Sequence, residues 1–126
     1  MILITGGAFQ GRTEYAKKRF SLSDADILDC GSCDLSGLTN ARCITRFELA
    51  VKRLIGDNTD PLAFAAKLNC EVVIMTEIGC GIIPLEKSER EWREATGRAG
   101  CILADKAAEV IRMCCGIPTV IKGGAQ

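Results

Sequence analysis

The sequence predicts an α/β domain, a three-layer sandwich in which helices cover both faces of a reduced, mainly parallel sheet. Short apolar segments typical of strands alternate along the chain with amphipathic segments typical of helices. The most apolar strand candidate, CEVVIMTEI at 70–78, has apolar residues on both faces, as central parallel strands do. With 126 residues, the chain is predicted to form one domain, residues 1–126, around a single modest core.

Local signals place the elements along the chain. Asp60-Pro61 gives an N-cap followed by proline at the first helical position, which predicts the start of a helix. Gly97 and Gly100 within the longest helix predict a kink or close packing there. The predicted elements are strands at 2–5, 25–31, 70–78, 109–115 and 119–122, helices at 12–20, from 45 to about 55, 61–68 and 85–108, and a loop at 79–84.

Composition excludes several classes of protein. Sixteen basic and sixteen acidic residues cancel, which predicts no binding to nucleic acid or anionic lipid. No apolar run reaches the ~18 residues of a membrane helix, and no secretory signal is recognisable, so the chain is expected to be cytoplasmic. Histidine is absent, which excludes Ser-His and Cys-His pairs, histidine metal ligands and histidine phosphoryl or nucleotidyl carriers.

A glycine-rich loop lies between the first predicted strand and helix. It matches the nucleotide-binding pattern G-x-x-x-x-G-K-[S/T] except that Arg12 replaces the lysine. Backbone N–H groups of such a loop and the helix N-terminus form an anion site, which predicts a P-loop NTPase-like fold that binds a purine nucleoside triphosphate. The residues predicted to bind the nucleotide are Gly6, Gly7, Ala8, Phe9, Gln10, Gly11, Arg12 and Thr13. The alternative is a glycine-rich turn that only joins strand to helix.

Polar residues in and near the loop are of the kinds that phosphoryl transfer from ATP or GTP needs. The Thr13 hydroxyl can bind Mg²⁺. Arg12 keeps the positive charge and can bond phosphate through two N–H groups, but it is larger than lysine and planar, so nucleotide binding should survive the replacement better than catalysis. Asp26 and Asp29 are the strand-end acids that could orient metal-bound water. The alternative for both is a surface acid at a strand end.

The second half of the chain resembles the C-terminal half of the adenosylcobinamide kinase/adenosylcobinamide-phosphate guanylyltransferase family. The similar segments are TEIGCGIIP, REWREATGRAG with its R-x-x-x-G-R pattern (Arg93, Gly97, Arg98), GIPTVIK and, at the front, ITGGAFQGRT. The resemblance implies a P-loop fold, oligomerisation and two steps. The first phosphorylates the aminopropanol hydroxyl of cobinamide, and the second attaches GMP through a histidine. It also implies that Glu77 contacts substrate or metal-bound water and that Arg98 pairs with phosphate, the alternatives being a solvent-facing strand end and a helix-face salt bridge.

The chain departs from the family pattern at several positions. It is shorter between the first helix and Thr45, where the guanylyl-accepting histidine belongs, and it has no histidine. The family's acid-Cys-Leu/Ile-Thr stretch is best matched by RCIT, residues 42–45, with Arg42 in place of the acid. The resemblance with these departures predicts a kinase-like protein of corrinoid metabolism with Arg12, Asp29 and Glu77 in catalytic roles. The first alternative is a homologue that binds nucleotide or corrinoid without catalysis.

The cysteines offer a further alternative. Cys30-Gly31-Ser32-Cys33 is a C-x-x-C motif, which in other folds forms a redox pair. A zinc site would need a distant cysteine such as Cys43. The same stretch can also be a turn that enters a helix capped by Asp34. Five other cysteines are expected to act as small apolar residues, namely Cys43, Cys70, Cys101, Cys114 and Cys115.

Overall fold

The computed structural model describes residues 1–8, 10–38, 41–78 and 85–123. Its strands are joined into a six-stranded sheet in the order β2-β3-β4-β1-β5-β6. All neighbouring strands are parallel except β5 and β6, which form an antiparallel pair at one edge. The strands are β1 (Ile2–Gly6), β2 (Ile27–Asp29), β3 (Cys43–Thr45), β4 (Val72–Ile74), β5 (Glu109–Cys114) and β6 (Ile117–Lys122). The predicted α/β fold with a mainly parallel sheet is confirmed.

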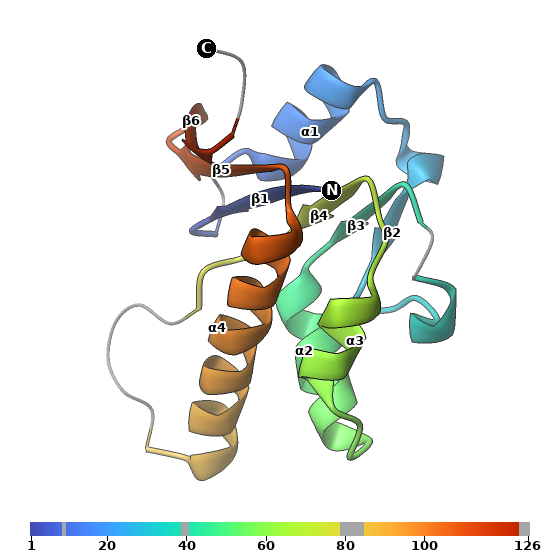
Figure 1. Cartoon of the computed structure of the whole chain (residues 1–126), viewed down its shortest axis with the longest axis vertical. Coiled ribbons are helices and arrows are strands. Elements are labelled where there is room, and N and C mark those ends of the chain that lie inside the picture. The colour runs from blue at the N-terminus through green and yellow to red at the C-terminus, as the bar shows by residue number, and fades with distance from the viewer. Residues whose placement is uncertain (9, 39–40, 79–84, 124–126) are drawn as a thin grey trace.

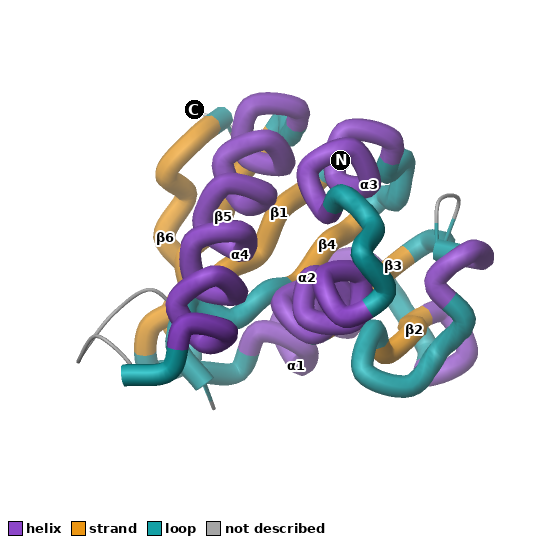
Figure 2. The backbone as a smooth tube through the Cα atoms, turned by 90° about the horizontal axis from the view of Figure 1, so that it is seen from below, coloured by secondary structure: helices purple, strands orange, loops and turns teal. Residues whose placement is uncertain are grey.

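Helices cover both faces of the sheet, as Figure 1 shows. One face carries α1, and the other carries α2, α3 and α4, which lie side by side in Figure 2. The helices are α1 (Arg12–Phe20), α2 (Phe47–Gly56), α3 (Pro61–Lys67) and α4 (Lys87–Lys106), with short 3-10 turns at η1 (Asp24–Asp26) and η2 (Leu35–Gly37). No helix within the described ranges is long and apolar enough to cross a membrane.

The core divides into two clusters because successive residues of a strand face opposite sides of the sheet. Leu3 in β1 packs with Phe47 and Leu103 on the face of α2 to α4. Ile4, the next residue of β1, packs with Ala16 of α1 on the other face. The two faces of the sheet are thus buried against different helices.

Several predicted elements differ from the observed ones. The strand predicted at 70–78 is limited to Val72–Ile74, and β3 was not predicted as an element of its own. Gly100 packs closely against Met75, because an added Cβ atom there would lie 3.3 Å from the Met75 Cε atom. An added Cβ atom at Gly97 meets nothing within 4 Å. The loop predicted at 79–84 lies outside the described residues.

Candidate nucleotide-binding site

The loop after β1 depends on two glycines. Gly6 has φ +148°, and an added Cβ atom would lie only 2.5 Å from the carbonyl oxygen of Met113, so no other residue fits there without a shift of β5. Gly11 is the N-cap of α1, with φ +79° in the left-handed region. Its conformation turns the chain into α1 directly beyond the carboxyl end of β1, where a helix N-terminus can bind an anion.

The loop is anchored to the turn between β5 and β6. The side-chain oxygen of Gln10 accepts a hydrogen bond of 2.5 Å from the N–H of Cys115. The carbonyl oxygen of Gln10 accepts another, of 3.3 Å, from the N–H of Gly116. Since no side chain caps the first turn of α1 among the described residues, the amide groups of that turn are available to a ligand. Phe9, also predicted to bind nucleotide, lies outside the described residues.

Arg12, the first residue of α1, points across the carboxyl edge of the sheet. Its guanidinium donates a hydrogen bond of 2.8 Å to the hydroxyl of Thr76, just after β4. Burial lowers the pKa of Arg12, and the carboxylates of Glu48 and Glu77 partly offset that effect. Arg12 therefore stays a cation that faces two carboxylates. Thr13 follows in the first turn of α1, half-buried beside the loop.

Glu48 is a buried carboxylate that the sequence analysis missed. It lies in the first turn of α2, three residues after β3, and is 6% exposed. Its Oε1 atom accepts a hydrogen bond of 2.9 Å from the N–H of Thr76, so it is held at the carboxyl edge of the sheet. The one signal for it in the sequence is an acid within an otherwise apolar stretch that starts a helix.

Glu77 lies next to the loop, where the family resemblance places an acid. Its N–H donates a hydrogen bond of 2.9 Å to the carbonyl oxygen of Gly6. Its carboxylate forms two hydrogen bonds with the Arg112 guanidinium of β5, of 3.0 and 3.2 Å. The alternative of a strand terminus facing open solvent does not describe it, because the side chain is half-buried and paired.

Asp29 is not brought to the loop. It ends β2, the edge strand, and β3 and β4 lie between β2 and β1. Three strand spacings separate β2 from β1 by about 14 Å. The carboxylate is ion-paired with Arg46 and accepts a hydrogen bond of 2.9 Å from the N–H of Gly31, and the Arg46 hydrogen bond lowers its pKa. Asp29 therefore stabilises the turn after β2.

Arg98 also lies apart from the loop. Its guanidinium pairs with Glu94 one helical turn earlier, at 2.7 Å, which is the helix-face salt bridge considered as its alternative. It lines a cavity of about 290 Å³ together with Asp60 and Leu62 at the start of α3. The surroundings of Arg98 are therefore Glu94 and the start of α3, and they do not include the loop that would bind phosphate.

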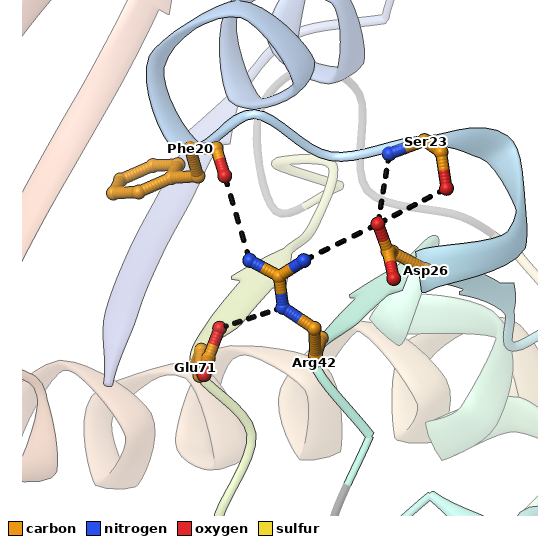
Figure 3. A network of polar contacts seen from close by, with 5 residues as sticks. All are labelled: Phe20, Ser23, Asp26, Arg42 and Glu71. Carbon is orange, nitrogen blue, oxygen red and sulfur yellow. Dashed lines mark hydrogen bonds and ion pairs between the residues drawn. The ribbon is translucent and has the colours of Figure 1, made fainter.

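Arg42 does not occupy the place of a metal-binding acid. It precedes β3 and so lies at the amino edge of the sheet, opposite the loop. Figure 3 shows its guanidinium between Asp26 and Glu71 and near the carbonyl oxygen of Phe20. The guanidinium nitrogen atoms lie 3.2 Å from the Asp26 carboxylate and 3.1 Å from that of Glu71. Asp26 is thereby engaged as well, and it also accepts a hydrogen bond from the N–H of Ser23. Arg42 therefore lies at the opposite edge of the sheet from the loop and is engaged with Asp26 and Glu71.

The C-x-x-C motif forms a turn after β2. Cys30 is buried, and burial raises the pKa of its thiol far above the ordinary range, whereas redox-active cysteines have lowered pKa values. Arg53 donates hydrogen bonds to the carbonyl oxygens of Cys30 and Cys33, at 2.9 and 2.7 Å. Asp34 caps η2 by accepting from the N–H of Ser36, as the turn interpretation expects. Among the described residues, no cluster of three metal-ligating side chains could hold a metal.

The arrangement combines a helix N-terminus, a half-buried cation and two carboxylates at one edge of the sheet. Hydroxyl and carboxylate oxygens are the ligands that Mg²⁺ prefers, and Mg²⁺ is usually bound by one or two of them together with substrate phosphates. Thr13, the residue after Arg12, and Glu48, whose carboxylate acts on the charge of Arg12, offer such oxygens. The donor set thus fits a magnesium ion that arrives with a nucleotide.

Comparison with known proteins identifies the family of this chain. The family model described as cobinamide kinase/cobinamide phosphate guanyltransferase matches residues 23–121, which include β2 to β5 and nearly all of β6. The match begins after α1, so the glycine-rich loop lies outside it. The search of curated proteins finds no match. Since the matched segment spans well over half of the 126 residues, the chain belongs to the cobinamide kinase/cobinamide phosphate guanyltransferase family.

Proposed function

We propose that this protein binds a purine nucleoside triphosphate with Mg²⁺ at residues 6–13 and transfers the γ-phosphoryl group to the hydroxyl of a cobinamide-type corrinoid. The family supplies the reaction class, since its name describes kinase and guanyltransferase activities. The observation that carries the proposal is the position of Arg12, which points from the N-terminus of α1 to Thr76 and faces two carboxylates. A phosphate bound at that helix N-terminus would lie beside a fixed guanidinium.

The reaction places the acceptor hydroxyl in line with the γ-phosphorus and the leaving oxygen of the nucleoside diphosphate. A bond forms between the hydroxyl oxygen and the γ-phosphorus, and the bond from that phosphorus to the bridging oxygen breaks. Arg12 and the loop amides stabilise the charge of the transferred group. Glu77, whose backbone is hydrogen-bonded to Gly6 of the loop, would orient the hydroxyl and accept its proton.

Mg²⁺ would be bound by the Thr13 hydroxyl and by phosphate oxygens, with Glu48 able to hold its water. When bound, the ion neutralises phosphate charge. Glu48 is fixed for this role because its Oε1 atom is held by the N–H of Thr76. Asp29, predicted for it from the sequence, has no part in the proposal because it lies two strands further from β1 than β4 does.

The proposal does not include the guanyltransferase step. The family's route for that step uses a histidine, and the chain contains none. Binding without transfer is the second candidate. One observation favours it: the carboxylate of Glu77 is already engaged by two hydrogen bonds from Arg112. A nucleotide could be held while that carboxylate stays unavailable to the acceptor.

A transfer assay distinguishes the two candidates. The protein is incubated with γ-³²P-labelled ATP or GTP, Mg²⁺ and adenosylcobinamide, and the label on the corrinoid is measured after chromatography. Transfer that falls at least tenfold in Arg12→Ala supports the kinase. Saturable nucleotide binding without label on the corrinoid supports binding alone. Absence of both would contradict the proposal that the loop is a nucleotide site.

We further propose that the chain self-associates and is cytoplasmic. The edge strand β6 exposes Ile117, Val120 and Ile121, with 66%, 46% and 59% of their surfaces accessible, and exposed apolar residues on an edge strand favour pairing with another chain. The seven cysteines among the described residues are free thiols, which suits a reducing compartment. Sedimentation of the purified protein tests the self-association.

A further inference from the structure

Arg112 is a charged residue in a strand that is otherwise largely buried. It lies in β5, where its neighbours Ile111 and Met113 are 0% and 2% exposed. β5 pairs in parallel with β1, and Arg112 is in register with Thr5, the residue before Gly6 of the loop. Ligands of open α/β sheets bind at the carboxyl ends of the strands. The arginine therefore lies at the edge of the sheet that carries the candidate phosphate site.

A carboxylate partner of Arg112 comes from the other side of β1. Glu77 follows β4, and β1 lies between β4 and β5 in the sheet. The carboxylate of Glu77 accepts hydrogen bonds of 3.0 Å from Nε and 3.2 Å from Nη2 of Arg112. The backbone N–H of Glu77 is bonded to the carbonyl oxygen of Gly6. The ion pair thus crosses β1 at the start of the loop.

The pair is open to solvent. The side chain of Arg112 is 58% exposed and that of Glu77 is 26% exposed, and exposed ion pairs contribute little to stability. The guanidinium presents two N–H groups to two oxygen atoms, which is also how arginine binds phosphate. A phosphate group that reaches Arg112 can therefore take the place of the carboxylate without a change in the strand.

Glu77 also acts on the other cation of the site. Burial lowers the pKa of Arg12, and the carboxylates of Glu48 and Glu77 act in the opposite direction. The charge of Glu77 is thus felt by the guanidinium groups of both Arg12 and Arg112. It competes there with the charge of a phosphate. The same carboxylate is the one that the proposed transfer needs as its proton acceptor.

We propose that Arg112 binds the γ-phosphate of the nucleotide and releases Glu77 in exchange. Arg112 holds Glu77 until a triphosphate binds. The guanidinium then bonds to two γ-phosphate oxygens, and the freed carboxylate accepts the proton of the acceptor hydroxyl. Nucleotide binding is thereby coupled to activation of the base. The inference rests on the proposed function, because it requires a triphosphate at the loop.

The test measures the affinity of the whole protein for GTP, ATP, GDP and ADP by calorimetry in the presence of Mg²⁺. Arg112→Gln is expected to weaken binding of the triphosphates about tenfold, the effect of losing hydrogen bonds between charged groups, and to change binding of the diphosphates less than about twofold. Arg112→Lys keeps the charge but not the two-point contact, so its affinity for the triphosphates should be intermediate. An arginine that only supports the strand would affect triphosphates and diphosphates alike.

Glu77→Gln should have the opposite effect on binding. It removes the competitor of the γ-phosphate, so affinity for GTP or ATP is expected to rise roughly two- to fivefold. Transfer to adenosylcobinamide is expected to fall roughly tenfold or more in the same variant, since the proton acceptor is lost. In the Arg112→Gln background the gain in affinity should shrink, because the two residues act on one contact.

The matched control is the pair of Arg42 and Glu71 at the opposite edge of the sheet, which Figure 3 shows. Its side chains are 45% and 65% exposed and lie 3.1 Å apart. Arg42→Gln and Glu71→Gln are expected to leave the affinity for all four nucleotides unchanged. Circular dichroism checks that every variant is folded, and Arg112→Lys carries the test if Arg112→Gln is not.

Two kinds of failure can be told apart. A wild-type protein that binds none of the nucleotides would overturn the proposed function and this inference with it. Triphosphate binding that is equal in the wild type and the Arg112 variants, or that Glu77→Gln weakens, would overturn the inference and leave the nucleotide site in place. A gain from Glu77→Gln of the same size with and without Arg112 would show that the residues act independently, and would overturn the exchange.

Discussion

The guanidinium of Arg12 donates a hydrogen bond of 2.8 Å to the hydroxyl of Thr76. The bond joins the start of α1 to the end of β4 across 64 residues of sequence. The backbone N–H of the same Thr76 is held by Glu48. One residue thus connects the cation at the helix N-terminus to a buried carboxylate, and the sheet edge carries a fixed charge pattern where a phosphate would bind.

Replacement of Arg12 should show that nucleotide binding depends on its positive charge. Arg12→Ala is expected to weaken ATP and GTP binding at least tenfold, because the half-buried cation beside the helix N-terminus is lost. Arg12→Lys is expected to retain binding, since it keeps the charge. The dissociation constants are measured by calorimetry, with Lys18→Ala as control because Lys18 is an exposed cation of the same helix. Equal affinity in all three variants would remove Arg12 from the site.

Glu48 should act in two separable ways. Glu48→Leu removes the acceptor of the Thr76 N–H and is expected to lower the free energy of unfolding by about 1–3 kcal/mol. Glu48→Gln keeps an oxygen acceptor but removes the charge, so it should preserve most of the stability and weaken the dependence of nucleotide binding on Mg²⁺. Urea unfolding and Mg²⁺ titrations measure the two effects. A Glu48→Gln variant with unchanged Mg²⁺ dependence would limit Glu48 to a structural role.

Alkylation should divide the cysteines by burial. Burial raises the pKa of Cys43 to about 12 and that of Cys70 to about 11, and raises the pKa of Cys30 further. Since the thiolate is the reactive form, iodoacetamide at pH 8 should modify the exposed cysteines first, as mass spectrometry can measure. Among the cysteines that the structure describes, the exposed ones are Cys101, Cys114 and Cys115. Rapid modification of Cys30 in the folded protein would instead favour the thiol-redox alternative.

Acid should weaken the contact between Arg19 and Glu109. Two hydrogen bonds of 2.8 Å from Arg19 lower the pKa of Glu109 below its usual 4.5, against the opposing effect of desolvation. Because the folded pKa lies below the unfolded one, this stabilisation is complete above about pH 4.5 and is lost as the pH falls through the lower folded value. Glu109→Gln should therefore be less stable than the wild type by about 1–2 kcal/mol at pH 7, with a smaller difference near pH 3. A difference independent of pH would contradict this account.

Local signals in the sequence predicted the helices well. Asp60 and Pro61 mark the start of α3 as predicted, since the Asp60 carboxylate accepts from the N–H of Leu62. The glycine-rich loop was also followed by a helix from Arg12 to Phe20 as expected. Such signals depend on neighbouring residues alone, so they can be read without the fold.

Strand order and long-range contacts could not be predicted in the same way. β3 has only three residues and is followed directly by Arg46, with φ +55°, and α2, so no period was long enough to indicate a strand. The sequence indicated Asp29 as a candidate acid and did not indicate Glu48. Only the strand order places β2 at the edge and brings Glu48 to Thr76, 28 residues away.

The central claim is that the loop binds a nucleoside triphosphate with Mg²⁺, and calorimetric titration with GTP and ATP, with and without Mg²⁺, tests it most directly. Gly11→Asp places a carboxylate at the helix N-cap, and Gly11→Asn is its neutral match, because both side chains tolerate the left-handed conformation. The account predicts Mg²⁺-dependent binding that Gly11→Asn retains and Gly11→Asp loses. No heat of binding with either nucleotide, or equal binding by the two variants, would contradict it.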